Sequence, residues 1–171
     1  MTMSMYQASV PVFVQMLGGL SHVLDKAEAY ATEKKADQGV MMSMRLHPTM
    51  WALAKEVQAA TDFARNTTAR LAGQEPMAIE ETEKTFADLK ARIKTSIDYV
   101  QSFKPAQIDG SEAKVLSLKM GGKDVTFKGQ DYLIGFALPN FYFFCTTAYD
   151  ILRCHGVDLV KRDYLGKMPG Q

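Results

Sequence analysis

The chain has 171 residues, of which 47% are hydrophobic and 23% charged, a composition typical of one soluble globular domain spanning residues 1–171. Twenty Lys and Arg residues nearly balance 19 Asp and Glu residues, which argues against a general nucleic-acid binder because such a protein needs a basic surplus. Two cysteines, no run of eighteen apolar residues and no basic flank before the apolar start lead us to expect a cytoplasmic protein without a membrane span.

Apolar residues that recur at steps of three and four predict a first helix over residues 5–34. Pro11 lies in its first turns, where it either kinks the helix or marks its true start. The pair Gly18 and Gly19 weakens this helix, and indicates either the close approach of a neighbouring segment or poor local stability.

A polar linker over residues 35–44 separates the first helix from a second, which we expect from His47-Pro48 to Gly73 because proline suits a first helical turn. Its apolar stripe includes Leu53, Val57 and Ala60. A third helix is predicted from Glu80 to Phe103.

The period then changes from helical to alternating, and two short runs around Gly121-Gly122 predict a β-hairpin over about residues 114–128. A lone hairpin is marginally stable in water, so it must lie against the helices. A fourth, largely apolar helix is expected from Gln130 to just before Gly156, kinked at Pro139, with a polar tail over residues 157–171 on the surface. The prediction is therefore an all-α four-helix bundle with a small hairpin between helices three and four.

The segment around Pro139 is the most distinctive in the chain, because proline inside a helix frees a backbone carbonyl near residue 135. Asn140 can satisfy that carbonyl or present a polar group to a cavity with apolar walls. The alternative is a kinked core helix whose hydroxyl groups bond the backbone. The residues proposed for a ligand pocket are Tyr6, Asn140, Tyr142, Phe144 and Tyr149.

Three further residues could meet at one end of the bundle if helices two and four are antiparallel: His47, Cys154 and His155. Nitrogen and sulfur ligands suit zinc, whereas the alternative is a solvated histidine at each helix end. Cys145 and Cys154 lie nine residues apart on one helix, too far for a disulfide, and are interpreted as inert thiols.

Several motifs are similar to those of a known family: Met5–Phe13, Gly129–Tyr132, Phe136–Phe143, Thr146–Tyr149 and Lys161–Gly166. They resemble an uncharacterised bacterial and fungal domain-of-unknown-function family within the DinB/YfiT-like superfamily. The resemblance covers nearly the whole chain. It implies a four-helix bundle with an up-down-down-up arrangement and, commonly, a homodimer.

The wider superfamily often binds a divalent metal, such as zinc or nickel, through one histidine on helix two and two on helix four, and some members are thiol-dependent transferases. That set does not carry over, since no histidine lies between Gln130 and Cys154. Phe144 stands where relatives tend to have histidine, and a phenyl ring cannot ligate a metal. We therefore expect no metal or other cofactor, with a site at His47, Cys154 and His155 as the alternative.

Three hypotheses of function follow from these patterns. The first is a dimeric DinB-like bundle whose apolar pocket binds a small molecule. The second is a metal- or thiol-dependent enzyme with a displaced site. The third is a structural interaction module whose apolar helix faces bind a partner protein.

Overall fold

The computed structural model describes residues 3–168, which form a mostly helical molecule with one small antiparallel sheet. The long helices of this region are α1 (Val10–Lys34), α3 (Leu53–Ala72), α4 (Phe86–Ser102) and α7 (Leu138–Cys154), and they lie side by side. The short helices are α2 (Gln38–Ser43), α5 (Pro105–Ile108), α6 (Gly129–Tyr132) and α8 (Lys161–Leu165). No helix in residues 3–168 has both the length and the apolar character that crossing a bilayer would require.

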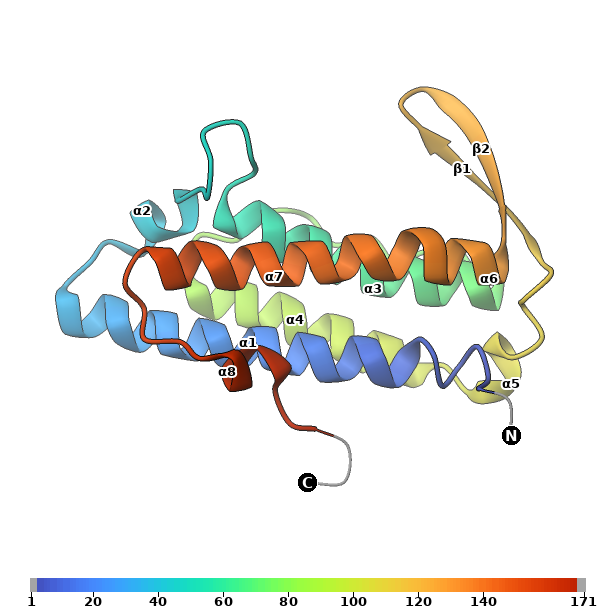
Figure 1. The fold of residues 1–171 in the computed structure, drawn as a ribbon, viewed down its shortest axis with the longest axis horizontal. Coiled ribbons are helices and arrows are strands. Elements are labelled where there is room, and N and C mark those ends of the chain that lie inside the picture. Colours follow the sequence, from blue (N-terminus) through green and yellow to red (C-terminus); the bar gives the residue numbers. More distant parts are fainter. Residues whose placement is uncertain (1–2, 169–171) are drawn as a thin grey trace.

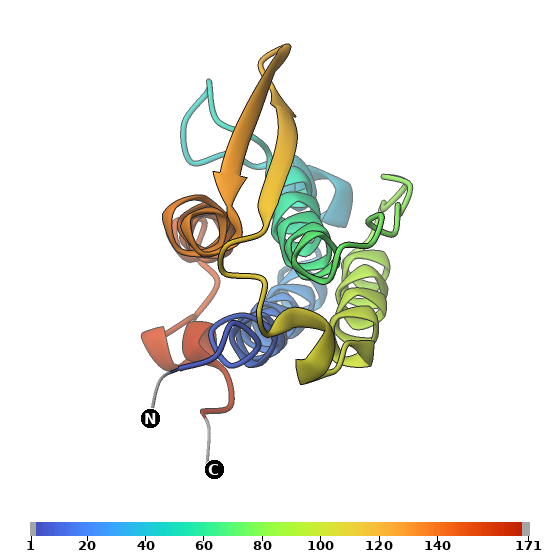
Figure 2. The same cartoon turned by 90° about the vertical axis from the view of Figure 1, so that its right-hand side faces the viewer.

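The four long helices of the described region run in two opposite directions. The colour sequence in Figure 1 shows α1 and α7 running one way and α3 and α4 running the other way. Helix α3 packs on both α7 and α4, while α1 packs on α4 and α7, so the apolar stripes of all these helices meet in one core. Figure 2 shows the helices nearly end-on around that core.

The first three long helices begin later than the sequence patterns predict. Helix α1 starts at Val10 rather than Met5, so Pro11 lies in its first turn and marks its true start. A proline fits there because the N–H groups of the first turn have no acceptor within the helix. Helix α3 starts at Leu53 rather than His47, because Pro48 lies in a turn and the Leu53 amide closes a loop by donating to the Met44 carbonyl at 2.9 Å.

The third long helix shows the same shift. It begins at Phe86 instead of Glu80, after a capping box in which the Thr85 hydroxyl accepts from the Asp88 amide and the Asp88 carboxylate accepts from the Thr85 amide. The polar linker after α1 also contains a helix that was not expected, α2, whose Asp37 side chain accepts from the Val40 amide.

The fourth predicted helix is continuous over residues 129–154 but changes its winding before Pro139. Residues Leu133–Ala137 (η1) form a π-helical turn between α6 and α7. A wider turn is how a helix accommodates a proline that cannot donate a hydrogen bond. The Asn140 side chain donates to the Phe136 carbonyl at 2.7 Å and so satisfies a backbone group close to the one expected to be freed.

The hairpin is formed by β1 (Val115–Met120) and β2 (Lys123–Lys128), as predicted. It does not lie along the helices as expected but stands out from them in both views (Figures 1 and 2). The turn residues Gly121 and Gly122 both have positive φ angles, 56° and 80°, which the tight hairpin turn requires. Phe127 attaches the hairpin to the helices, since its ring lies 5.6 Å from that of Phe136.

The C-terminal segment is attached to the molecule more firmly than a surface tail. Val157 and Leu159 are buried, and α8 packs on α1. A Cβ atom placed on Gly19 would overlap the Tyr164 carbonyl oxygen, and one placed on Gly166 would lie 2.9 Å from the Gly19 Cα. Gly19 therefore permits close approach of the C-terminal segment, whereas Gly18 has open space around it.

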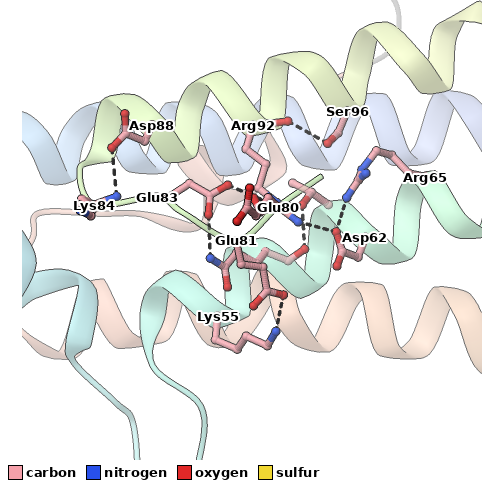
Figure 3. Close-up of polar contacts among 12 residues, drawn as sticks. Lys55, Asp62, Arg65, Glu80, Glu81, Glu83, Lys84, Asp88, Arg92 and Ser96 are labelled. Atoms are coloured by element: carbon pink, nitrogen blue, oxygen red, sulfur yellow. Dashed lines mark hydrogen bonds and ion pairs between the residues drawn. The ribbon is translucent and has the colours of Figure 1, made fainter. Parts of the chain in front are cut away.

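Arg92 connects α4 to α3 and to the loop between them, over residues 73–85 (Figure 3). Its side chain is 1% exposed. It donates to Asp62 at 2.7 Å, Glu83 at 2.8 Å, the Thr61 hydroxyl at 2.8 Å and the Glu80 carbonyl at 3.1 Å. Burial alone would lower the pKa of this guanidinium, but the two carboxylates outweigh it and raise the pKa.

A second buried arginine, Arg65, shares the Asp62 carboxylate and donates to the Met77 carbonyl at 2.5 Å. Burial lowers the pKa of Arg65, and neighbouring Arg92 acts in the same direction. Two arginines thus hold the loop over residues 73–85, which has no secondary structure of its own, against the paired helices.

Candidate functional site

A cavity of about 320 Å³ opens where the loop before α3 meets α7. We call it the aromatic pocket, lined by Thr49, Met50, Trp51, Glu56, Asn140, Phe143 and Phe144. Its volume is at the small end of the range for ligand pockets in proteins. Two residues of the predicted pocket, Asn140 and Phe144, line it, and both come from the kinked helix that suggested a site.

Aromatic rings form much of its lining. The rings of Trp51 and Phe144 are stacked, with centroids 5.5 Å apart and planes 11° from parallel, and Phe63 packs on Phe144 from the core side at 5.4 Å. Trp51 is 47% exposed although it is stacked, so part of its surface remains open to solvent. The Lys55 ammonium lies 5.8 Å from the centre of the Trp51 ring and pairs with Glu81.

Glu56 provides the ionisable group of this pocket. The residue is 2% exposed, and its Oε2 atom is buried with no hydrogen-bond partner among the described residues. Loss of hydration raises its pKa from 4.5 to about 7. A buried carboxyl without a donor is unfavourable for folding, and such groups are concentrated at functional sites.

Asn140 is held in place by its own helix. Because its Nδ2 donates to the Phe136 carbonyl, the position of its amide group follows from the π-helical turn that Pro139 requires. The two interpretations of Asn140 made from the sequence are compatible, since its side chain both bonds a backbone carbonyl next to the kink and lines a cavity.

The other three residues of the predicted pocket lie elsewhere. Tyr149 packs edge-on against Tyr164 of α8, with ring centroids 5.9 Å apart, and Tyr142 packs against Phe141. Burial raises the pKa of Tyr142 and also that of the Cys145 thiol, so neither group is prepared to ionise. Neither Tyr142 nor Tyr149 lines the aromatic pocket.

Tyr6 lines a second and larger hollow of about 950 Å³, which we call the α1 groove. It runs beside Val10, Val14 and Gly18 toward the C-terminal segment. The groove and the aromatic pocket share no lining residue, so the predicted pocket residues are divided between two hollows and the contact of α7 with α8.

The alternative metal site is not assembled. His47 Nδ1 lies 3.0 Å from the Thr49 hydroxyl, while His155 Nδ1 lies 2.7 Å from the Ile151 carbonyl and 3.4 Å from the Cys154 sulfur. Within residues 3–168, no three His, Cys, Asp or Glu side chains lie close enough together to hold a metal ion. At the aromatic pocket, Phe144 offers no donor atom to a metal, so this set of residues does not fit the three-histidine pattern.

Two important residues of the pocket were not found from the sequence. Trp51 precedes α3 in a loop, where no pattern placed it near the fourth helix. Glu56 did carry a signal, because it lies beside Val57 and one turn from Leu53, on the buried face of its helix. A charged residue on an apolar helix face is the pattern that would have indicated a buried carboxyl.

These observations define a mostly helical protein with a small hairpin and an aromatic pocket between two of its long helices. The model of the family "Domain of unknown function (DUF1993)" matches residues 5–165, and the chain belongs to this family. A solved structure described as a DinB family member protein from Shewanella denitrificans is 37% identical to it, covers 97% of this chain and 94% of that chain, and gives a TM-score of 0.86. No curated protein matches the chain.

Proposed function

We propose that this protein is a DinB-type four-helix bundle, up-down-down-up in order, that binds a small organic molecule in the aromatic pocket. The likeness to a DinB family member over almost the full length of both chains supports the bundle, and so do the run directions of the long helices. The observation that carries the binding function is Glu56, a buried carboxyl with an unpartnered oxygen beside a stacked pair of aromatic rings.

Binding can be measured without a label, because Trp51 is the single tryptophan of the chain and lines the pocket. A panel of small aromatic and aliphatic compounds is titrated while the Trp51 emission and the melting temperature are recorded. We expect some members to change the emission and raise the melting temperature, since a ligand that binds the native state stabilises it.

Two variants locate the binding site. Phe144→Leu removes the ring that stacks on Trp51 and should weaken binding, whereas His22→Ala, in the α1 groove, should leave it unchanged. A panel in which no compound changes either signal, or binding that responds to His22→Ala but not to Phe144→Leu, would contradict the proposal.

We also propose that the protein is a homodimer that needs no metal. Native mass and elemental analysis of untagged protein test both parts in one sample. A monomer, or one equivalent of zinc or nickel per chain that is lost in His47→Ala, would contradict them.

A further inference from the structure

Resting on the proposed function, we further propose that the ligand of the aromatic pocket is a small organic cation, an amine bound as its ammonium ion. The amine would donate to Glu56 while its carbon skeleton packs against Trp51 and Phe144. Three features of the pocket lead to this class of ligand: its charge, its unpartnered acceptor and its aromatic surface.

The charge of the pocket has one sign. Glu56 is the one ionisable side chain among the seven lining residues, and none of these is Lys, Arg or His. Three charged or ionisable neighbours of the lining lie outside it. Lys55 lies over Trp51 and is paired with Glu81, Arg45 donates to the Met50 carbonyl, and His47 contacts the Thr49 hydroxyl. An anionic ligand would find no cation in the lining, whereas a cation would find a carboxylate.

The unpartnered oxygen of Glu56 requires a donor. When ionised, a carboxylate can only accept hydrogen bonds, and Oε2 receives none from the described residues. Asn140 uses one of its two Nδ2 hydrogens in donating to the Phe136 carbonyl, and its Oδ1 is a second acceptor on a residue that lines the pocket. An ammonium group, which carries three donors and no acceptor, complements such a site.

The aromatic surface suits the same ligand. Ring faces attract cations through their quadrupole and also cover apolar carbon, so a stacked Trp51–Phe144 pair accommodates both parts of an alkyl- or arylalkylamine. A volume of about 320 Å³ restricts the ligand to a small molecule.

The pH dependence follows from the groups that face Glu56. The lining residues from α7 are Asn140, Phe143 and Phe144, and those from the loop are Thr49, Met50 and Trp51, none of which titrates near neutrality. Glu56, with a pKa of about 7, therefore controls binding. Simple amines stay protonated to above about pH 9, as lysine does, so their affinity should increase between about pH 6 and about pH 8.

The test uses two matched series, benzylamine and butylamine against benzyl alcohol and butanol, titrated while Trp51 emission is followed. At about pH 8 we expect each amine to bind at least about tenfold more tightly than its alcohol, the size of a hydrogen bond to a charged group. Glu56→Gln keeps the size of the side chain and removes its charge, so the preference of the pocket for amines over alcohols should disappear.

Several results would overturn the inference while leaving the pocket as a binding site: alcohols that bind as tightly as amines, affinity that rises as the pH falls, or a preference for amines that survives in Glu56→Gln. Absence of binding by both series would count against the binding function itself. Should Glu56→Gln fail to fold, the ¹³C shift of the Glu56 carboxyl in the native protein replaces it. An amine must then lower the pKa of Glu56, and an unchanged pKa would refute the ion pair.

Discussion

Glu56 makes the stability of the protein depend on pH in a direction opposite to that of most carboxyl groups. Its pKa is about 7 in the native state and near 4.5 in an unfolded chain. Below about pH 4.5 the group is protonated in both states, and between the two pKa values only the native state retains the proton. The free energy of unfolding therefore falls as the pH rises through this window, and the loss is complete above pH 7.

Replacement of Glu56 with Gln tests this linkage. Urea unfolding of both proteins at about pH 5 and about pH 8 should show the wild type losing about 2 kcal/mol relative to Glu56→Gln. This is less than the full pKa difference implies, because pH 5 already lies above the pKa of the unfolded state. If the two proteins lose stability in parallel, the carboxyl group is not the origin of the effect.

Gly18 and Gly19 are neighbours in α1, but a side chain would have free space at Gly18 and would meet the C-terminal segment at Gly19. Alanine variants at the two positions therefore form a matched pair. Gly19→Ala should destabilise the protein by about 2 kcal/mol, because its Cβ would overlap the Tyr164 carbonyl and displace the C-terminal segment. Gly18→Ala meets no atom and should stabilise the helix by about 0.5–1 kcal/mol. Thermal unfolding measures both, and equal effects would mean that the close approach is unimportant.

At the scale of elements, the shared carboxylate of Asp62 joins α3 to α4. Asp62→Asn removes the anion that faces both Arg65 and Arg92, leaving buried guanidinium groups with too little negative charge nearby. We expect a loss of about 3 kcal/mol in chemical unfolding. The control is Asp98→Asn, which breaks the exposed pair with Lys94 and should change stability by less than about 0.5 kcal/mol. Similar losses in both variants would contradict a special role for the buried network.

Sequence patterns predicted which helices exist better than where they begin. The apolar periodicity that indicates a helix can continue into a segment that is not helical, as with Met5, which is buried although it precedes the start of α1 at Val10. Local chemistry decided the starts: Thr85 and Asp88 form a capping box, whereas Pro48, a good first-turn residue, lies in a turn instead. Helix α3 has no side-chain cap at Ala52, so no local signal marked its start.

At the scale of the whole molecule, the sequence predicted a helical protein with a small hairpin, but neither the projection of that hairpin nor the composition of the pocket. The Pro139 kink drew attention to Asn140 and Phe144, which line the aromatic pocket, because the cause of the kink is local to one helix. Trp51 and Glu56 join them only through the packing of α3 against α7, which depends on contacts far apart in the chain. Periodicity gives the buried face of each helix but not which residues of two helices meet.

The hairpin should behave as a separate unit of stability within this molecule. Leu116 is its one buried residue, and its attachment depends on Phe127, whose ring packs against Phe136. Phe127→Ala should therefore increase amide hydrogen exchange over residues 115–128 by at least about tenfold, because the strands can open while the long helices stay folded. In the middle of α3, the exchange rate of the variant should stay much closer to that of the wild type.

Thr126→Ala, at an exposed neighbouring position, is the matched control and should leave exchange in the hairpin nearly unchanged. The physical reason is that a strand ladder of twelve residues buries too little apolar surface to persist without an anchor on the helices. If Phe127→Ala accelerated exchange equally in the hairpin and in α3, the two would unfold together, and the hairpin would have to be regarded as part of the helical core.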